Sequence, residues 1–306
     1  MLKTTRISKN TASVKNLSAC QISIQSPAKL NVGLRVLGRG ADGYHQLQSV
    51  FWPVTFADEI TLVRSLKNEV TARWHPDATL TVPLPQGRDN LAFSAVERFS
   101  SQSWSVTISK RIPLGGGLGG GSSNAGTVLR AIPLEYRADL SNVVTLGADV
   151  PFFLDPRPSW VEGIGEKCQA LAFDSDFVTD LAFLMILPRV ASETRRVFQR
   201  YRQSRPVFSP AGEKPSFNGK ADFIRYLNTA RNDLESIVCD ELPDVRAILQ
   251  EIRRIPSLYA GMSGSGSVCY CVFDSLTAAN AAAKDLAAFC RQNNCKSVVT
   301  QTYAHH

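Results

Sequence analysis

The chain has 306 residues, of which 44% are hydrophobic and 20% charged, as is typical of a globular protein with room for two domains. Its formal net charge of +7 suits anionic partners such as nucleotides or phosphorylated metabolites, although a basic surface without a specific partner fits equally well. The longest purely apolar run covers residues 181–187, far short of the roughly 20 residues that span a bilayer. We therefore expect no membrane partner.

Cysteine and histidine usage argues against disulfides and zinc. The seven cysteines are an odd number without a C-x-x-C pair, which indicates reduced thiols in a reducing compartment. Cys269 and Cys271 alternate within one expected strand and should share a face. With only four histidines, two of them at the C-terminus, no zinc site is expected, and we assign no metal-ligating residue.

The first 20 residues contain no acidic residue and are rich in Lys, Arg, Ser, Thr and Asn. This composition favours a basic, disordered extension over residues 1–20 of a cytoplasmic protein. An organellar transit peptide has the same composition, so a plastid location is the alternative.

From residue 21 the pattern becomes strand-like. Apolar runs, interrupted by turn residues at 38–43, predict strands over residues 21–25, 31–37, 47–54, 59–64 and 103–112. Residues 122–132 predict a helix that Ser122 or Ser123 caps and Pro133 ends. A short helix or tight turn is expected at residues 148–151.

The second half alternates strands and helices in another order. A buried strand over 180–187 precedes a basic helix over 193–203 and a polar surface loop over 204–220. Two helices broken near Pro243, a strand–turn–strand unit, a further helix and a closing strand are expected in residues 232–254, 257–273, 277–294 and 296–303. This order favours an α+β layer of ferredoxin-like type. We place a domain boundary near residue 162, which gives domains 21–162 and 163–306.

Residues 115–121 hold six glycines just before the expected helix of residues 122–132. The segment matches G-x-G-x-x-G, and Glu135 follows 20 residues after Gly115, as in a dinucleotide-binding fold of a hydride-transfer enzyme. Against this interpretation, the segment lies mid-chain behind strands that look antiparallel, and Pro113 stands where an apolar strand should end. A Walker A loop is excluded because no Gly-Lys-Ser/Thr occurs. Bare amides at a helix N-terminus would instead surround a polyphosphate.

Three other short segments carry chemically useful groups. Lys29 and Asn31 lie two residues apart in "SPAKLN", on one side of an expected strand. Tyr44 and His45 follow a turn and offer an aromatic face and an imidazole, as a nucleobase needs, although a surface turn is the simpler interpretation. Asp149 stands among apolar residues as either a helix cap or a general base.

Taken in order, "PAKLNVGLRVLGRGADGYHQLQSVF", "KRIPLGGGLGGGSSNAG", "LGADVPFFL" and "GMSGSGS" resemble the GHMP kinase superfamily. The resemblance covers most of the chain from about Ser26 and implies an α+β, two-domain GHMP kinase fold, with an N-terminal ribosomal-protein-S5-like domain and a C-terminal ferredoxin-like domain. The "PAKLN" and "DGYH-x-L" pair favours a member that phosphorylates a cytidine-diphosphate-linked sugar alcohol over homoserine, mevalonate or galactose kinases. Another GHMP kinase with a different alcohol substrate is the alternative.

The resemblance also implies roles for individual residues. Asp149 would accept the proton of the alcohol's 2-hydroxyl, and Lys29 beside it would stabilise the developing alkoxide. Asn31, Tyr44, His45, Ile164 and Phe198 would bind the cytidine-linked substrate. ATP, carried with Mg²⁺, would contact Lys110, Pro113, Leu114, Gly115, Gly116, Gly117, Leu118, Gly119, Gly120, Gly121, Ser122 and Ser123. The expected partners are small molecules, and the expected state is a monomer or weak homodimer.

The chain departs from this family in two segments, and one basic helix suggests a different kind of ligand. Residues 91–109 and 133–145 are shorter than is usual in the family, which puts the wall near the adenine in question. The basic helix carries several arginines interleaved with Phe198 and Tyr201, as a nucleic-acid-binding surface would. These arginines spread around the helix, so we favour a solvated face and expect no nucleic-acid partner; they are Arg195, Arg196, Arg200, Arg202 and Arg205.

Overall fold

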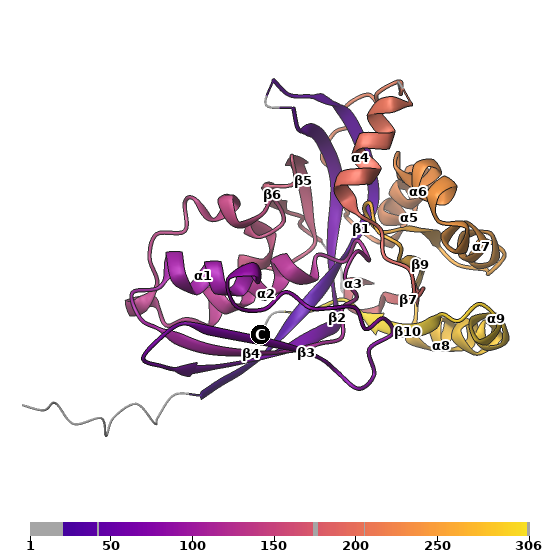
Figure 1. The fold of residues 1–306 in the computed structure, drawn as a ribbon. Helices are drawn as coiled ribbons and strands as arrows, with labels where there is room; N and C mark the ends of the chain where they lie inside the picture. The colour runs from indigo at the N-terminus through magenta and orange to yellow at the C-terminus, as the bar shows by residue number, and fades with distance from the viewer. Residues whose placement is uncertain (1–20, 42, 174–176, 205, 305–306) are drawn as a thin grey trace, which may run out of the picture.

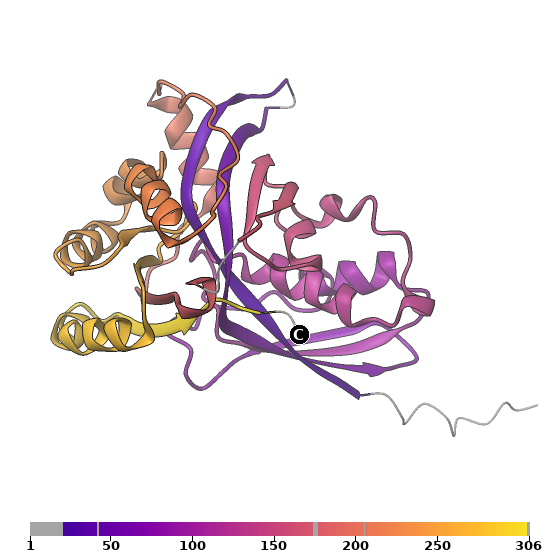
Figure 2. The same ribbon diagram turned by 180° about the vertical axis from the view of Figure 1, so that it is seen from behind.

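The computed structural model describes residues 21–41, 43–173, 177–204 and 206–304. The extension expected over residues 1–20 therefore lies outside the described residues. A long central hairpin separates an N-terminal half, which holds one sheet and two longer helices, from a C-terminal half with a second sheet and its helices (Figures 1 and 2).

The first sheet has six strands in the order β3-β4-β2-β5-β6, with β1 paired to β2. All pairings are antiparallel except that of β3 with β4. The helices α1 (Leu91–Phe99) and α2 (Gly120–Ala131) pack against the face of β2, β3 and β4, and the 3-10 turn η5 (Pro151–Leu154) packs against β2 and β5. The strands are β1 (Gln21–Arg39), β2 (His45–Arg64), β3 (Glu69–Trp74), β4 (Trp104–Lys110), β5 (Ser159–Gly163) and β6 (Lys167–Ala170).

The first four predicted strands are in fact the two long strands β1 and β2. Register shifts between Pro27 and Ala28, between Val32 and Leu34, and between Val36 and Gly38 break the alternation of β1 without ending it. These bulges twist the hairpin, so β1 contributes side chains to three separate hydrophobic cores.

The second sheet has the order β10-β7-β9-β8, with every pairing antiparallel. In chain order the strands number 4-1-3-2, with helices between the first and second and between the third and fourth, so the ferredoxin-like prediction is confirmed. Its strands are β7 (Ala182–Leu187), β8 (Tyr259–Met262), β9 (Cys269–Phe273) and β10 (Lys296–Gln301). Its helices are α3 (Phe177–Asp180), α4 (Thr194–Gln203), α5 (Lys220–Thr229), α6 (Glu235–Glu241), α7 (Pro243–Ile252), α8 (Leu276–Asp285) and α9 (Ala287–Gln292).

The expected domain boundary needs a correction. Residue 162 lies inside β5, and β6 still pairs with β5 in the first sheet. The chain therefore leaves the first sheet after residue 170 and enters the second at residue 182. The short strands β3, β5 and β6 were not predicted, because none of them contains a long apolar run.

Helix α2 begins two residues earlier than predicted. Its N-cap is Gly119, with φ at 69°, and Ser122 and Ser123 lie in its first turn, so neither is the cap. It ends at Ala131, before Pro133, as predicted. Within residues 133–145 regular structure consists of the 3-10 turn η3 (Leu134–Tyr136) and the beginning of η4 (Val143–Leu146).

Cys269 and Cys271 both face the core of the second sheet, as their alternation predicted. The cysteines within the described ranges are all free thiols. No helix within these ranges has the length and hydropathy of a membrane span.

Candidate active site

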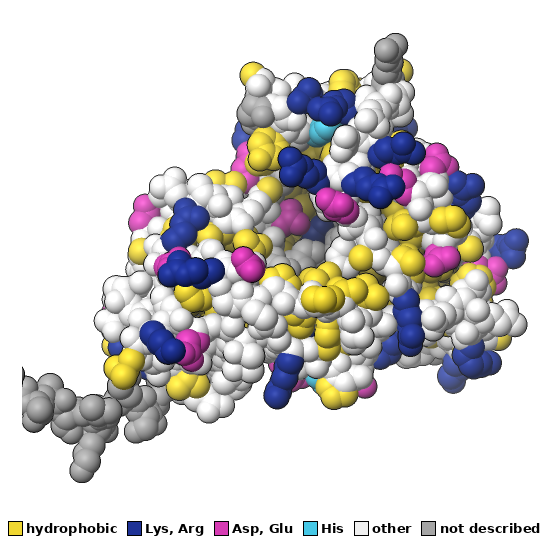
Figure 3. All heavy atoms as spheres, viewed as in Figure 1, with side chains coloured by type: hydrophobic (Ala, Val, Ile, Leu, Met, Phe, Trp, Pro, Cys, Tyr) yellow, Lys and Arg dark blue, Asp and Glu magenta, His cyan; other side chains and the backbone are white. Residues whose placement is uncertain are grey.

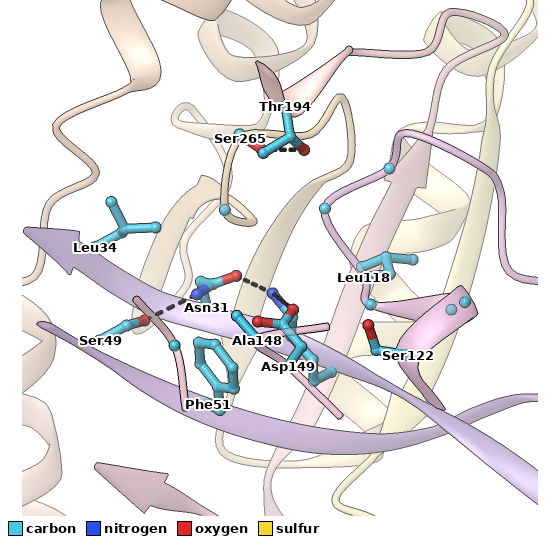
Figure 4. A pocket seen from close by; sticks show the side chains of 18 of the residues that line it. Asn31, Leu34, Ser49, Phe51, Leu118, Ser122, Ala148, Asp149, Thr194 and Ser265 are labelled. Atoms are coloured by element: carbon cyan, nitrogen blue, oxygen red, sulfur yellow. Dashed lines mark hydrogen bonds and ion pairs between the residues drawn. The ribbon is translucent and has the colours of Figure 1, made fainter. Parts of the chain in front are cut away.

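A cavity of about 370 Å³ opens between the two halves of the molecule. Figure 3 shows it as a hollow in the middle of one face, and Figure 4 shows the side chains that project into it. Its walls come from β1, β2, the glycine-rich segment, the turn before η5, α4 and the loop between β8 and β9. The first and last lining residues, Lys29 and Ser265, are thus more than 200 residues apart in the sequence.

The glycine-rich segment forms one wall and is held in a left-handed backbone at alternate residues. Gly115, Gly117 and Gly119 have φ values of 69°, 77° and 69°, which residues with a side chain rarely adopt. At Gly117 a Cβ atom would overlap the carbonyl oxygen of Ser263. Glycine is therefore required there both for the backbone angle and for the close approach of the two loops.

The carbonyl groups of this segment bond to the rest of the protein. Gly115 O accepts from the amide of Ser267 at 3.2 Å, Gly117 O from Ser263 Oγ at 2.9 Å, and Leu118 O from the amide of Lys29 at 3.1 Å. Next in the chain, the first N–H groups of α2 have no partner within the helix, and they carry the positive end of its dipole. The wall thus presents amide donors suited to phosphate oxygens.

Lys29 and Asp149 face the same cavity from β1 and from the turn before η5. Lys29 Nζ lies 3.7 Å from Asp149 Oδ2, and the side chains are 5% and 29% exposed. The ammonium also bonds to Asn31 Oδ1 and lies 4.5 Å from the centre of the Phe51 ring. Burial lowers the pKa of Lys29, and the Asp149 carboxylate opposes this shift by Coulomb attraction and a hydrogen bond.

Asn31 is fixed on the floor of the cavity from several sides. Its Nδ2 donates to Ser49 Oγ at 3.0 Å (Figure 4). Its backbone N–H donates to Ser263 Oγ at 3.1 Å. Across the cavity, the hydroxyls of Thr194 and Ser265 lie 2.8 Å apart. Thr194 was not predicted as a site residue. The one clue in the sequence was a hydroxyl side chain at the start of the basic helix.

An aromatic cluster lies beside the cavity and reaches it through Phe198. The His45 ring stacks on Phe198 with centroids 5.0 Å apart and meets the edge of Tyr201 at 6.0 Å. Burial and the nearby charges of Arg39 and Arg202 lower the pKa of His45. Phe198 lines the cavity. His45 and Tyr44 are not among the residues that line the cavity, and Tyr44 is 62% exposed on the turn before β2.

Lys110 and Ser123 lie behind the glycine-rich wall, away from the cavity. Ser123 Oγ bonds to the carbonyl of Pro27 at 2.6 Å, and Lys110 is buried in an ion pair with Asp58. Asp58 is fully buried and also accepts from the amides of Arg111 and Ile112, at 2.7 and 2.9 Å.

This buried network, which sequence reasoning missed, holds the start of the glycine-rich segment against β2. Its third side chain is Asn124 of α2, whose Nδ2 donates to Asp58 at 2.9 Å. The available signal was the acidic pair Asp58 and Glu59 among apolar residues in "FADEI". The remaining expected residues do meet at the cavity: Lys29, Asn31, Asp149, Ile164, Phe198 and all of 113–122.

The dinucleotide-binding interpretation lacks its structural context. In a dinucleotide-binding unit the helix after the loop leads to a second parallel strand. Here the next strand after α2 is β5, which pairs antiparallel with both β2 and β6, and Glu135 lies in the 3-10 turn η3. On α4, Arg196 and Arg200 both pair with Glu241, at 3.1 and 3.2 Å. Arg205 lies outside the described residues.

Comparisons with known proteins agree with this site. Residues 90–154 match the GHMP kinases N terminal domain, and residues 220–292 match the GHMP kinases C terminal model. A homoserine kinase from Cytophaga hutchinsonii shares the fold, with a TM-score of 0.60 at 16% identity over 92% of this chain and 94% of its own. A deep cleft, a glycine-rich wall and these two domains together define a GHMP kinase, an ATP-dependent small-molecule kinase, and the predicted α+β two-domain fold is confirmed.

Closer relatives narrow the class. The 4-diphosphocytidyl-2-C-methyl-D-erythritol kinase of Syntrophotalea carbinolica is 33% identical over 86% of this chain and 94% of its own length. That of Nitrosospira multiformis is 34% identical over 87% of each. A crystal structure of 4-(cytidine 5'-diphospho)-2C-methyl-D-erythritol kinase superimposes with a TM-score of 0.69 at 28% identity, covering 92% of this chain and all of that one. The chain belongs to the family of 4-diphosphocytidyl-2-C-methyl-D-erythritol kinases.

Proposed function

We propose that this protein transfers the γ-phosphoryl group of ATP to the 2-hydroxyl of 4-diphosphocytidyl-2-C-methyl-D-erythritol, a step of the non-mevalonate route to isoprenoid precursors. One observation carries the proposal: the Lys29–Asp149 pair, at 3.7 Å, faces the glycine-rich wall across one cavity. The names of the relatives support the choice of alcohol.

Phosphoryl transfer depends mainly on positioning and on neutralising charge. The Asp149 carboxylate accepts the proton of the hydroxyl, whose oxygen forms a bond to the γ-phosphorus while the bond to the β-phosphate oxygen breaks. The Lys29 ammonium stabilises the negative charge that grows on the attacking oxygen. Burial of Lys29 strengthens this attraction because less water screens it.

The residues present fit ATP with Mg²⁺. The amides at the start of α2 would receive the phosphate oxygens, and the cavity offers hard oxygen donors in the Ser122 hydroxyl and the Asp149 carboxylate, which Mg²⁺ prefers. When bound, Mg²⁺ supplies positive charge to the β- and γ-phosphate oxygens. His45 and Phe198 of the aromatic cluster would hold the cytosine by stacking and hydrogen bonding.

The test is a kinase assay with 4-diphosphocytidyl-2-C-methyl-D-erythritol, comparing the native chain with Asp149→Asn. Loss of the base should lower kcat by about 10²- to 10⁴-fold while the variant still binds ATP. Asp139→Asn, which changes an exposed carboxylate that accepts from Ser141, is the matched control and should retain full activity. Phosphorylation of homoserine or mevalonate in preference to the cytidylyl alcohol would overturn the choice of substrate.

A further inference from the structure

A pair of cysteines lies at the C-terminal end of α9, away from the cavity. The backbone N–H of Cys295 donates to the carbonyl of Cys290 at 3.0 Å, and that of Asn294 donates to Arg291 at 3.5 Å. Asn294 has φ at 51°, the one positive value outside glycine among the described residues. This bond pattern with a left-handed residue is a Schellman motif, which brings the third-from-last helical residue into contact with the second residue after the cap.

In most helices that contact is between two apolar side chains, but here both positions are cysteine. Cys290 is 6% exposed and belongs to the core of the second sheet, and Cys295 is partly buried against the same core. A backbone hydrogen bond between the two residues also keeps their Cα atoms within the short range that a disulfide needs. The helix terminus therefore preorganises the two sulfur atoms.

The hydrogen bonds around the two thiols favour deprotonation of the pair and so its reaction as a nucleophile. A hydrogen bond from Cys295 and another from Ser297 lower the pKa of Cys290, against the opposing effect of burial. The hydrogen bond between the two thiols and burial raise the pKa of Cys295. The pair therefore releases its first proton more readily than an ordinary thiol, and the thiolate is the nucleophilic form. By contrast, burial raises the pKa of the unpaired Cys239.

We propose that Cys290 and Cys295 form a reversible dithiol–disulfide site that reacts with low-molecular-weight disulfides. One sulfur of the pair attacks a disulfide RSSR as the thiolate, forming a mixed disulfide and releasing RS⁻. The second sulfur loses its proton and displaces the remaining RS group, so that the S–S bond between the two residues forms. Two protein thiols are oxidised, one RSSR is reduced to two RSH, and the two thiol protons go to the released thiolates.

The crosslink joins the end of α9 to the start of β10, the edge strand that pairs with β7. Closing this short loop restricts the unfolded chain, so the oxidised protein should show a melting temperature higher by a few degrees. Neither cysteine lines the cavity, and α9 lies at the far side of the C-terminal half (Figure 1), so kinase activity should be unchanged.

Trypsin makes the test direct, because it cleaves after Arg291 and Lys296 and so separates the two cysteines. The reduced, full-length protein is incubated with oxidised glutathione, quenched in acid, alkylated and digested. The expected product is a crosslinked pair of peptides, residues 285–291 joined to 292–296, that a thiol reductant separates. Cys239, on its own peptide, is the internal control and should be recovered alkylated.

The variant Cys295→Ser removes the resolving thiol and should yield no crosslinked peptide, with Cys290 either alkylated or carrying glutathione. Two results would overturn the proposal for the native chain. One is recovery of both peptides alkylated in proportions equal to that of Cys239. The other is a crosslinked peptide that forms only in urea, which would assign the reaction to the unfolded chain.

Discussion

The buried ion pair between Asp58 and Lys110 allows one prediction of defined size. The two side chains are 0% and 4% exposed, so Asp58→Asn leaves a buried ammonium without its counter-charge. Removing one partner of a buried pair costs about 3–5 kcal/mol of unfolding free energy. Because Asp58 also holds the amides of Arg111 and Ile112, the glycine-rich segment should loosen. We therefore expect a higher KM for ATP with a smaller change in KM for the alcohol.

Urea unfolding of Asp58→Asn and of the double variant Asp58→Asn/Lys110→Met measures this cost. The double variant removes both charges and should recover part of the lost stability, because no uncompensated charge stays buried. The reasoning is refuted if Asp58→Asn unfolds within about 1 kcal/mol of the native protein, or if the double variant is less stable than the single one.

Three further outcomes are expected. Gly117→Ala should abolish ATP turnover, because φ is 77° and a Cβ atom would overlap a neighbouring carbonyl oxygen. Gly121→Ala should be tolerated, because the atom nearest to its new Cβ would lie at 3.7 Å. Steady-state kinetics with varied ATP compare the two variants. Burial lowers the pKa of Lys29, so kcat should fall as pH rises through a value below the usual 10.5, and a pH–rate profile with an unchanged alkaline limb at 10.5 would contradict this. Phe198→Leu should raise KM for the cytidylyl alcohol several-fold and leave KM for ATP unchanged, as initial rates with each substrate varied would show.

Much of the site could be predicted from local sequence because its chemistry is concentrated in short motifs. Lys29, Asp149 and the glycines each lie in a segment whose composition conflicts with simple packing. The ferredoxin-like order of strands and helices also follows from periodicity alone. These features need only near neighbours in the chain to be recognised.

Side-chain direction could not be predicted in the same way. Ser122 and Ser123 are adjacent, yet only Ser122 reaches the cavity, because the true start of α2 turns Ser123 toward Pro27. Lys110 is the last residue of β4, and its buried side chain meets Asp58 of β2, 52 residues earlier in the chain. No local sequence pattern predicts such a contact between side chains that are distant in the chain.

The hydrogen bonds that the carbonyl groups of the glycine-rich segment accept couple the phosphate-binding wall to the folding of the C-terminal half. Its backbone is anchored to the C-terminal half at Gly115 and Gly117, and to β1 at Leu118. A molecule whose C-terminal half has come undocked therefore loses the shape of its phosphate wall at the same moment. We therefore expect ATP to be consumed only by molecules in which both halves have completed folding.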